Sequence, residues 1–355
     1  MTHVRGIPHE VVLHYFVAAR RSRLRPSALR ATLALIAVSV AACGGGADTS
    51  TPNTPNAPSG TLSPAARTYL TELVAVMQEH SLNRTKIDWN VFRTSVMSAA
   101  GAAQSVEQTF PAIRTALEML GDGHSLYRPV TGTSITAARA CVAPNADTPV
   151  LPPTVAYVRV GAFSGSAAEA TAFANAVQGA IASADRDGLA GWTVDVRGNG
   201  GGNMWPMLAG VGPVLGAGRA GYFIDPLGAA TAWEYRDGGS WLSGVLLQAV
   251  DTPYRLRQES PRVAVLIDGA TASSGEAITI AFQRRPDTRT FGTATCGRST
   301  ANQQFTMSDG AVLGLTVSTM ADRTRVPYGA QIAPDEPVTD PSEAEQRAVA
   351  WLTAR

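Results

Sequence analysis

Residues 263–276 read Val-Ala-Val-Leu-Ile-Asp-Gly-Ala-Thr-Ala-Ser-Ser-Gly-Glu. The apolar, β-branched beginning of this stretch predicts a buried strand that ends at Asp268-Gly269, and a helix is expected from Glu276. A serine at such a strand-to-helix turn is held clear of the sheet beside backbone N–H groups, as a serine nucleophile requires. The alternative is an Asp-Gly turn followed by a Ser/Thr-rich helix cap, which is common in α/β proteins.

The rest of the chain predicts an α/β core behind a small helical region. Strands are expected at 154–160, 192–196, 290–291 and 312–317, and helices at 166–184, 204–215 and 342–352. Three earlier helical patterns, at 63–77, 89–103 and 106–120, form an N-terminal helical region over 63–123. The core then occupies 124–355. Within it, an aromatic-rich insertion at 218–258 is a possible cap over a cleft. We expect most of the aromatic residues in this insertion to serve in packing and not to contact substrate.

The first 42 residues have the pattern of a secretory signal. A basic segment at 20–30 precedes a short apolar segment at 31–40, which is well below the ~20 residues that a bilayer requires. The sequence Val-Ala-Ala-Cys at 40–43 resembles a bacterial lipobox, which implies cleavage before Cys43 and lipidation of its thiol. Residues 43–62, rich in Gly, Ser, Thr and Pro, are expected to be a flexible linker. We therefore predict a lipid-anchored protein of the cell envelope, on the periplasmic face of the outer membrane.

The composition excludes some classes of function. With 45% hydrophobic residues among 355, the chain can bury a large core, and no Lys/Arg block indicates nucleic-acid binding. Beyond Cys43, only Cys141 and Cys296 remain, and the sequence leaves open whether they form a disulfide or stay free. Neither lies in a His/Cys cluster, so we expect no metal and no other cofactor.

The basic residues available to a serine nucleophile are few. After Cys43 the chain contains two histidines, His80 and His124, and one lysine, Lys86. His80 and Lys86 lie in the first helical region, whereas His124 lies in the glycine-flanked turn Gly-Asp-Gly-His-Ser at 121–125. If the protein is a serine hydrolase, His124 is the base by elimination. The alternative is a turn histidine without a catalytic role.

A glycine loop follows the strand expected at 192–196. It reads Arg-Gly-Asn-Gly-Gly-Gly-Asn at 197–203 and lacks the spacing of a P-loop or a dinucleotide site. The N–H groups of Gly201 and Gly202, together with that of Ser274, are our candidates for an oxyanion hole.

Several motifs in order resemble the tail-specific, or carboxy-terminal processing, serine peptidases. They are Leu-Gly-Asp-Gly-His-Ser at 120–125, Asp-Val-Arg-Gly-Asn-Gly-Gly-Gly-Asn at 195–203, Thr-Ala-Ser-Ser-Gly-Glu at 271–276 and Ile-Ala-Pro-Asp at 332–335. The resemblance runs from about residue 63 to the C-terminus and implies a crotonase-like α/β peptidase core. Between His124 and residue 154 there is too little chain for the PDZ domain that many of these peptidases carry.

The resemblance also implies roles for individual residues. It makes Ser273, rather than Ser274, the nucleophile. Where the Ser-Lys peptidases carry a lysine, this chain has Arg298, which does not deprotonate to act as a base. The chain therefore resembles the Ser-His branch, which includes the tricorn core and the nisin resistance proteins. That subgroup gives Glu276 a supporting role at the active site, and the alternative is a surface residue in the first turn of a helix.

We therefore expect a serine endopeptidase that cleaves peptides or exposed protein tails through a Ser273–His124 dyad and an acyl-enzyme. The alternatives are a catalytically inactive lipoprotein on the same fold that only binds peptides or ligands, and a structural lipoprotein whose glycine loop is only a tight turn.

Overall fold

The computed structural model describes residues 60–144 and 146–354. The predicted signal peptide over 1–42, the lipidation site Cys43 and nearly all of the linker lie outside the described residues. Within them, no helix is long and apolar enough to span a bilayer. The helices are α2 (Pro64–His80), α3 (Trp89–Ala100), η1 (Glu107–Thr109), α4 (Phe110–Leu120), α5 (Ala167–Ala184), α6 (Met204–Leu215), α7 (Ser274–Phe282) and α8 (Pro341–Thr353).

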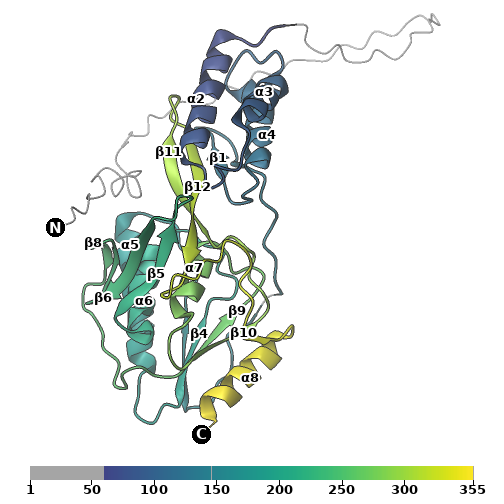
Figure 1. Ribbon diagram of the computed structural model, residues 1–355. Helices are drawn as coiled ribbons and strands as arrows, with labels where there is room; N and C mark the ends of the chain where they lie inside the picture. Colours follow the sequence, from purple (N-terminus) through teal and green to yellow (C-terminus); the bar gives the residue numbers. More distant parts are fainter. Residues whose placement is uncertain (1–59, 145, 355) are drawn as a thin grey trace, which may run out of the picture.

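Helices α2, α3 and α4 gather at one end of the molecule, and a long hairpin joins them to the remainder (Figure 1). Ser63 caps α2 with its side chain, and Asp88 caps α3, as Ser and Asp commonly do at helix N-termini. The hairpin consists of β11 (Thr300–Thr306) and β12 (Val312–Ala321). Its residues Met307, Leu313 and Leu315 share one hydrophobic cluster with the three helices. The helical region therefore completes its core with residues from the far C-terminal part of the chain.

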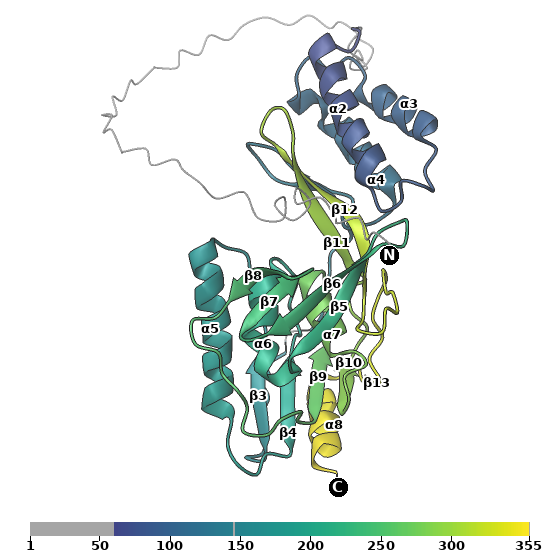
Figure 2. The ribbon, with the colours of Figure 1, turned by 60° about the vertical axis from the view of Figure 1, so that its left-hand side comes forward.

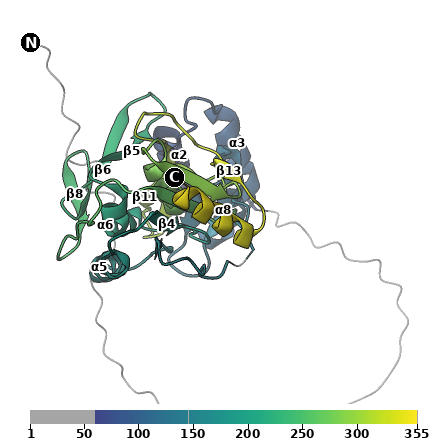
Figure 3. The same cartoon turned by 90° about the horizontal axis from the view of Figure 1, so that it is seen from below.

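A five-stranded parallel sheet forms the centre of the core. Its strands are β3 (Val155–Arg159), β4 (Gly191–Asp195), β9 (Val263–Ile267), β10 (Thr288–Gly292) and β13 (Glu336–Pro337), in the order β13-β10-β9-β4-β3. Every residue of β4 and β9 is buried, as expected of strands covered on both faces. Alternate residues of β9 face different helices: Val265 packs in the cluster of α5, α6 and α7, and Leu266 in the cluster of α8. Figure 3 shows α6 and α8 on opposite sides of β4.

A second, larger sheet packs on α6 and α7, on the side of the parallel sheet opposite to α8 (Figure 2). Its order is β2-β1-β12-β5-β6-β7-β8, with β11 paired to β12. Helix α6 is buried along nearly its whole length because its cluster includes residues of both sheets. The strands not yet given are β1 (Leu126–Arg128), β2 (Ile135–Thr136), β5 (Gly218–Ile224), β6 (Ala230–Arg236), β7 (Gly239–Leu242) and β8 (Val245–Ala249).

The segment 218–258, expected as a possible cap, supplies strands β5–β8 of this sheet. Trp233 and Tyr235 are buried in the main core, and the Tyr235 ring packs so close to Gly212 of α6 that a Cβ there would lie 1.9 Å from it. The segment is therefore a layer of the core and not a separate cap, because its aromatic side chains are needed to cover α6. Packing is the role that the sequence suggested for most of these aromatic residues.

Candidate active site

Ser273 lies in the turn between β9 and α7, immediately before the first residue of the helix. Its backbone has φ 53° and ψ −115°, a region that non-glycine residues rarely occupy and that costs ~1–3 kcal/mol. Such strain persists only where the surroundings hold the residue in place, and it is frequent at active sites. Ser273 is partly exposed, whereas Ser274 is buried.

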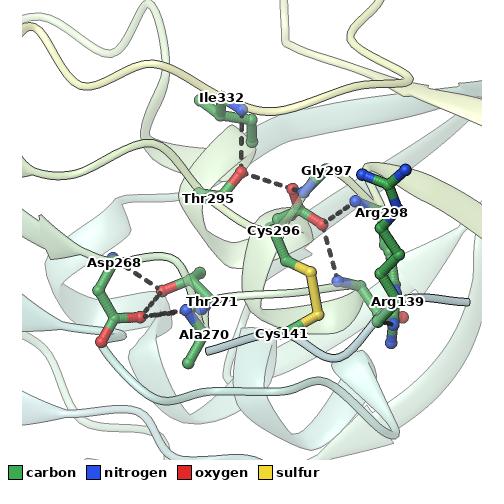
Figure 4. Close-up of a disulfide and its surroundings, with 12 residues drawn as sticks. Arg139, Cys141, Asp268, Ala270, Thr271, Thr295, Cys296, Gly297, Arg298 and Ile332 are labelled. Atoms are coloured by element: carbon green, nitrogen blue, oxygen red, sulfur yellow. Dashed lines mark hydrogen bonds between the residues drawn. A yellow bond between two sulfur atoms is a disulfide. The ribbon is translucent and has the colours of Figure 1, made fainter. Parts of the chain in front are cut away.

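Asp268 organises this turn. Its carboxylate accepts hydrogen bonds from the N–H groups of Ala270 and Thr271, at 3.0 and 2.9 Å, and from the Gly198 N–H at 3.1 Å. Figure 4 shows Asp268 with Ala270 and Thr271. Because Gly198 belongs to the glycine loop, one carboxylate joins the turn that carries Ser273 to the loop that follows β4.

The glycine loop lies directly against the turn that carries Ser273. The Ala272 N–H donates to the Asn199 carbonyl at 2.9 Å, and the Ser274 hydroxyl donates to the Gly202 carbonyl at 2.6 Å. A Cβ on Gly201 would lie 2.8 Å from the Ser273 Cβ, and Gly201 also has φ +107°. Glycine is therefore required there both by the backbone conformation and by the close approach to Ser273.

The three predicted oxyanion-hole amides differ in what they bind. The Gly201 N–H donates to the Asn199 side-chain oxygen at 3.0 Å, so that amide is already engaged. Among the residues that the structure describes, the N–H groups of Gly202 and Ser274 have no hydrogen-bond acceptor. The hydrogen bond from the Ser274 hydroxyl to the Gly202 carbonyl holds these two residues side by side. Gly202 and Ser274 are thus the available donors of the predicted set.

Glu276 is fully buried in the first turn of α7, so it is not the surface residue of the alternative reading. One carboxylate oxygen accepts the N–H groups of Ser273 and Arg298, at 2.9 and 2.7 Å. The other accepts the Thr295 hydroxyl at 2.5 Å and the Gly297 N–H at 2.9 Å. Burial raises the pKa of this carboxyl, and the four hydrogen bonds oppose that rise. Glu276 therefore ties the Ser273 backbone to the loop 295–298.

Cys296 of the loop 295–298 forms a disulfide with Cys141, and the Cα atoms of the two residues are 5.4 Å apart. The sequence alone left this pairing open. Figure 4 shows the disulfide beside Gly297 and Arg298, and the Arg298 guanidinium donates to the Arg139 carbonyl. The loop that binds Glu276 is thereby fixed to the segment that follows β2.

His124 lies between α4 and β1, at the junction of the helical region and the core. Its N–H donates to the Asp122 carboxylate at 2.8 Å, and its carbonyl accepts from the Asn302 side chain at 3.0 Å. The ring Nδ1 lies 2.8 Å from the Thr300 hydroxyl. Burial, and then the positive charge of Arg298, lower the pKa of His124 to about 4, and Asp122 opposes this. The imidazole is therefore neutral, and able to accept a proton, at neutral pH.

No hydrogen bond joins the His124 ring to the Ser273 hydroxyl among the described residues. The two are nevertheless attached to the same segment of chain. Glu276 binds both the Ser273 N–H and the Arg298 N–H, and Thr300, two residues beyond Arg298, contacts the His124 ring. Hydrogen bonds between catalytic groups often form or shorten only when substrate is bound, so this geometry is compatible with a dyad.

Sequence reasoning missed Thr300 and Asn302. Both lie just after Arg298, in a stretch where no strand was predicted but β11 forms. The other histidine of the described residues, His80, stacks on Phe305 of β11 with ring centroids 4.7 Å apart. Across residues 60–144 and 146–354, no three His, Cys, Asp or Glu side chains form a group that could hold a metal.

The comparisons with known proteins agree with this architecture. The nisin-resistance protein of Lactococcus lactis subsp. lactis is 24% identical over 292 residues, which cover 82% of this chain and 88% of that protein. A solved structure of a lipoprotein from Streptococcus agalactiae superposes with a TM-score of 0.66 at 20% identity, covering 82% of this chain and 97% of the other. The photosystem II D1 C-terminal processing protease gives a TM-score of 0.54 at 16% identity, over 81% and 97% of the two chains. These likenesses at low identity show a shared fold.

The family model for peptidase family S41 matches residues 154–338. This segment is slightly more than half of the chain, and it includes the glycine loop, the Ser273 turn and Glu276 but not His124. The resemblance to the tail-specific and carboxy-terminal processing peptidases is confirmed, as is the mixed helix and sheet fold. The chain belongs to peptidase family S41, and its substrate is a peptide or protein.

Proposed function

We propose that this peptidase is a serine endopeptidase of the cell envelope that acts through Ser273 and His124. The observation that carries the proposal is the Ser273 turn itself. A partly exposed serine stands in a strained conformation at a helix N-terminus, and the N–H groups of Gly202 and Ser274 beside it are without acceptors among the described residues. A serine that only capped a helix would not need that strain.

The proposed reaction begins when substrate brings the His124 Nε2 within reach of the Ser273 hydroxyl. The hydroxyl oxygen attacks the scissile carbonyl carbon while its proton passes to His124, and the carbonyl oxygen becomes an oxyanion. The amides of Gly202 and Ser274 stabilise that oxyanion, a contribution worth about 3–4 kcal/mol per donor in serine peptidases. His124 then protonates the leaving amine, which departs and leaves an acyl-enzyme. Water, deprotonated by His124, hydrolyses the ester and restores Ser273.

We assign Glu276 a positioning role in this reaction, because it holds the nucleophile's N–H without reaching the hydroxyl. Gly201 acts through its lack of a side chain rather than through its amide, which is bound to Asn199. This division leaves two amide donors for the oxyanion.

The chemistry is tested by cleavage of a defined peptide mixture, with new termini identified by mass spectrometry. The wild type is expected to generate new N-termini over time. Ser273→Ala is expected to generate none, while Ser274→Ala, which keeps the backbone amide, continues to cleave. If wild type and Ser273→Ala give the same termini, the proposed role of Ser273 is wrong. If neither generates termini from peptides or from unfolded protein tails, the inactive binding lipoprotein is the better account.

Anchoring in the membrane through Cys43 is part of the proposal. It is supported by the Val-Ala-Ala-Cys sequence and by the likeness to a streptococcal chain whose structure is described as that of a lipoprotein. The full chain with Cys43→Ala is expected to leave the membrane fraction and to lose the mass of the lipid. Retention of both would contradict the anchor, whatever the result for Ser273.

A further inference from the structure

The Thr300 hydroxyl contacts the ring of the base that we propose. Its oxygen lies 2.8 Å from His124 Nδ1, and both residues are buried, with 4% of Thr300 and 9% of His124 exposed. Nδ1 is the ring nitrogen farther from the end of the side chain. Because Thr300 occupies it, Nε2 is the nitrogen that remains to accept the proton of Ser273.

Thr300 is held where it is by the same network that holds the nucleophile. It is the first residue of β11, where it pairs with Thr319 of β12. The chain immediately before it runs through Arg298 and Gly297, whose N–H groups are bound by Glu276, and Glu276 also binds the Ser273 N–H. A fixed geometry of this segment therefore fixes the position of the Thr300 hydroxyl relative to Ser273.

The backbone of His124 is restrained independently of its ring. The Asp122 carboxylate accepts its N–H, and the Asn302 side chain donates to its carbonyl. These contacts place the Cα of His124 but leave rotation about the side-chain bonds free. Among the described residues, the Thr300 hydroxyl is the only hydrogen-bond partner of the ring, so it is the contact that sets the direction of the imidazole.

A threonine differs from the aspartate of a Ser-His-Asp triad in an important respect. The hydroxyl orients the ring, but it has no charge with which to stabilise the imidazolium. The charged groups that act on His124 are Arg298, which disfavours the protonated ring, and Asp122, whose carboxylate favours it but is bound to backbone N–H groups. Orientation and charge are thus supplied by different residues here.

We propose that Thr300 is a positioning residue of this peptidase, which holds the His124 ring through Nδ1 so that Nε2 is directed to Ser273. The inference rests on the proposed function, since it concerns the ring that the function makes the base. Thr300 becomes a third member beside Ser273 and His124, because its hydroxyl lies at Nδ1, where the aspartate of a Ser-His-Asp triad binds the histidine.

The test uses the rate at which a fluorophosphonate probe phosphonylates the protein, separated into the maximal rate constant and the half-saturating probe concentration. Thr300→Val removes the hydroxyl at nearly constant volume, and we expect the maximal rate to fall by about 10- to 100-fold, part of the 10²–10⁴ that a positioned base supplies. Half-saturation should change by less than about twofold, because the probe does not bind Thr300. Thr300→Ser restores the hydroxyl and should recover most of the rate. Thr306→Val, the same change at an exposed position of β11, is the matched control.

Thr300→Asp supplies a readout that a purely structural role would not change. A carboxylate at Nδ1 favours the protonated ring, so the acid limb of the rate against pH should move to higher pH. If Thr300→Val fails to fold, this displacement decides the matter by itself. An unchanged acid limb in Thr300→Asp, or wild-type labelling of folded Thr300→Val, would overturn the inference while Ser273→Ala remained unlabelled. Labelling of Ser273→Ala would instead overturn the proposed function.

Discussion

Replacing Glu276 with glutamine is expected to weaken the fold and the active site together. The glutamine oxygen can still accept the N–H groups of Ser273 and Arg298. Its NH2 group would face the Gly297 N–H and the Thr295 hydroxyl, and both of these donors then lose their acceptor on residue 276. One buried amide without an acceptor costs ~1–3 kcal/mol, and the two remaining bonds lose the assistance of a charge. Removal of a buried charge offsets part of this loss, because burial already raises the pKa of Glu276. The expected net destabilisation is about 2–4 kcal/mol.

Thermal unfolding and fluorophosphonate labelling measure the two consequences. For a chain of this size, the midpoint temperature should fall by roughly 3–6 °C. Labelling should slow by about 100-fold, because release of the loop 295–298 displaces the Ser273 backbone. Glu276→Ala, which leaves three amides without an acceptor, should be destabilised further. Glu343→Gln on α8 removes an equal charge from a half-exposed ion pair with Arg347 and should change stability by less than about 0.5 kcal/mol.

Glu276→Gln should not unfold at the temperature of Glu343→Gln while being labelled at the wild-type rate. That result would mean that the four hydrogen bonds to the carboxylate do not determine the geometry of the turn.

Three further changes probe the same site. Gly201→Ala places a Cβ 2.8 Å from the Ser273 Cβ and should reduce labelling by about 100-fold. Its control is Gly188→Ala, where φ is +79° and no atom lies within 4 Å of the new Cβ, so the protein should lose stability through backbone strain but keep its labelling rate. Reduction of the Cys141–Cys296 disulfide, or the double serine variant, should lower the unfolding free energy by about 2–5 kcal/mol, and an unchanged midpoint temperature would contradict this. The pKa of His124 is lowered to about 4, so the ring is neutral above that pH. The labelling rate should therefore stay constant on acidification until it falls near pH 4. A fall of the rate near pH 6.5 would contradict the burial of the ring.

Much of the core was predictable because its signals are local. The buried strands and the helices follow from apolar runs and helical spacing, and from the turn at Asp268-Gly269. The turn that carries Ser273 and the adjoining glycine loop were also predicted, since glycines are needed where two backbones approach.

The remainder of the site depends on contacts between distant parts of the chain. Thr300 meets His124 across 176 residues, and Cys141 meets Cys296 across 155. No periodicity in one segment encodes such pairs. The engagement of the Gly201 amide by Asn199 is a local bond, but it depends on a side-chain orientation that the sequence does not state. The segment 218–258 was not recognised as a layer of the core although its partner α6 directly precedes it in sequence, because no local pattern indicates which face of the helix its strands cover.

The central claim, that Ser273 is the nucleophile, is tested most directly by mapping the fluorophosphonate adduct. Trypsin should release residues 263–284 as one peptide that contains both Ser273 and Ser274, and fragmentation distinguishes the two. The account predicts that the adduct lies on Ser273, is lost in Ser273→Ala and persists in Ser274→Ala, because the Ser274 hydroxyl is committed to the Gly202 carbonyl. An adduct on Ser274, or one that survives Ser273→Ala, would contradict it.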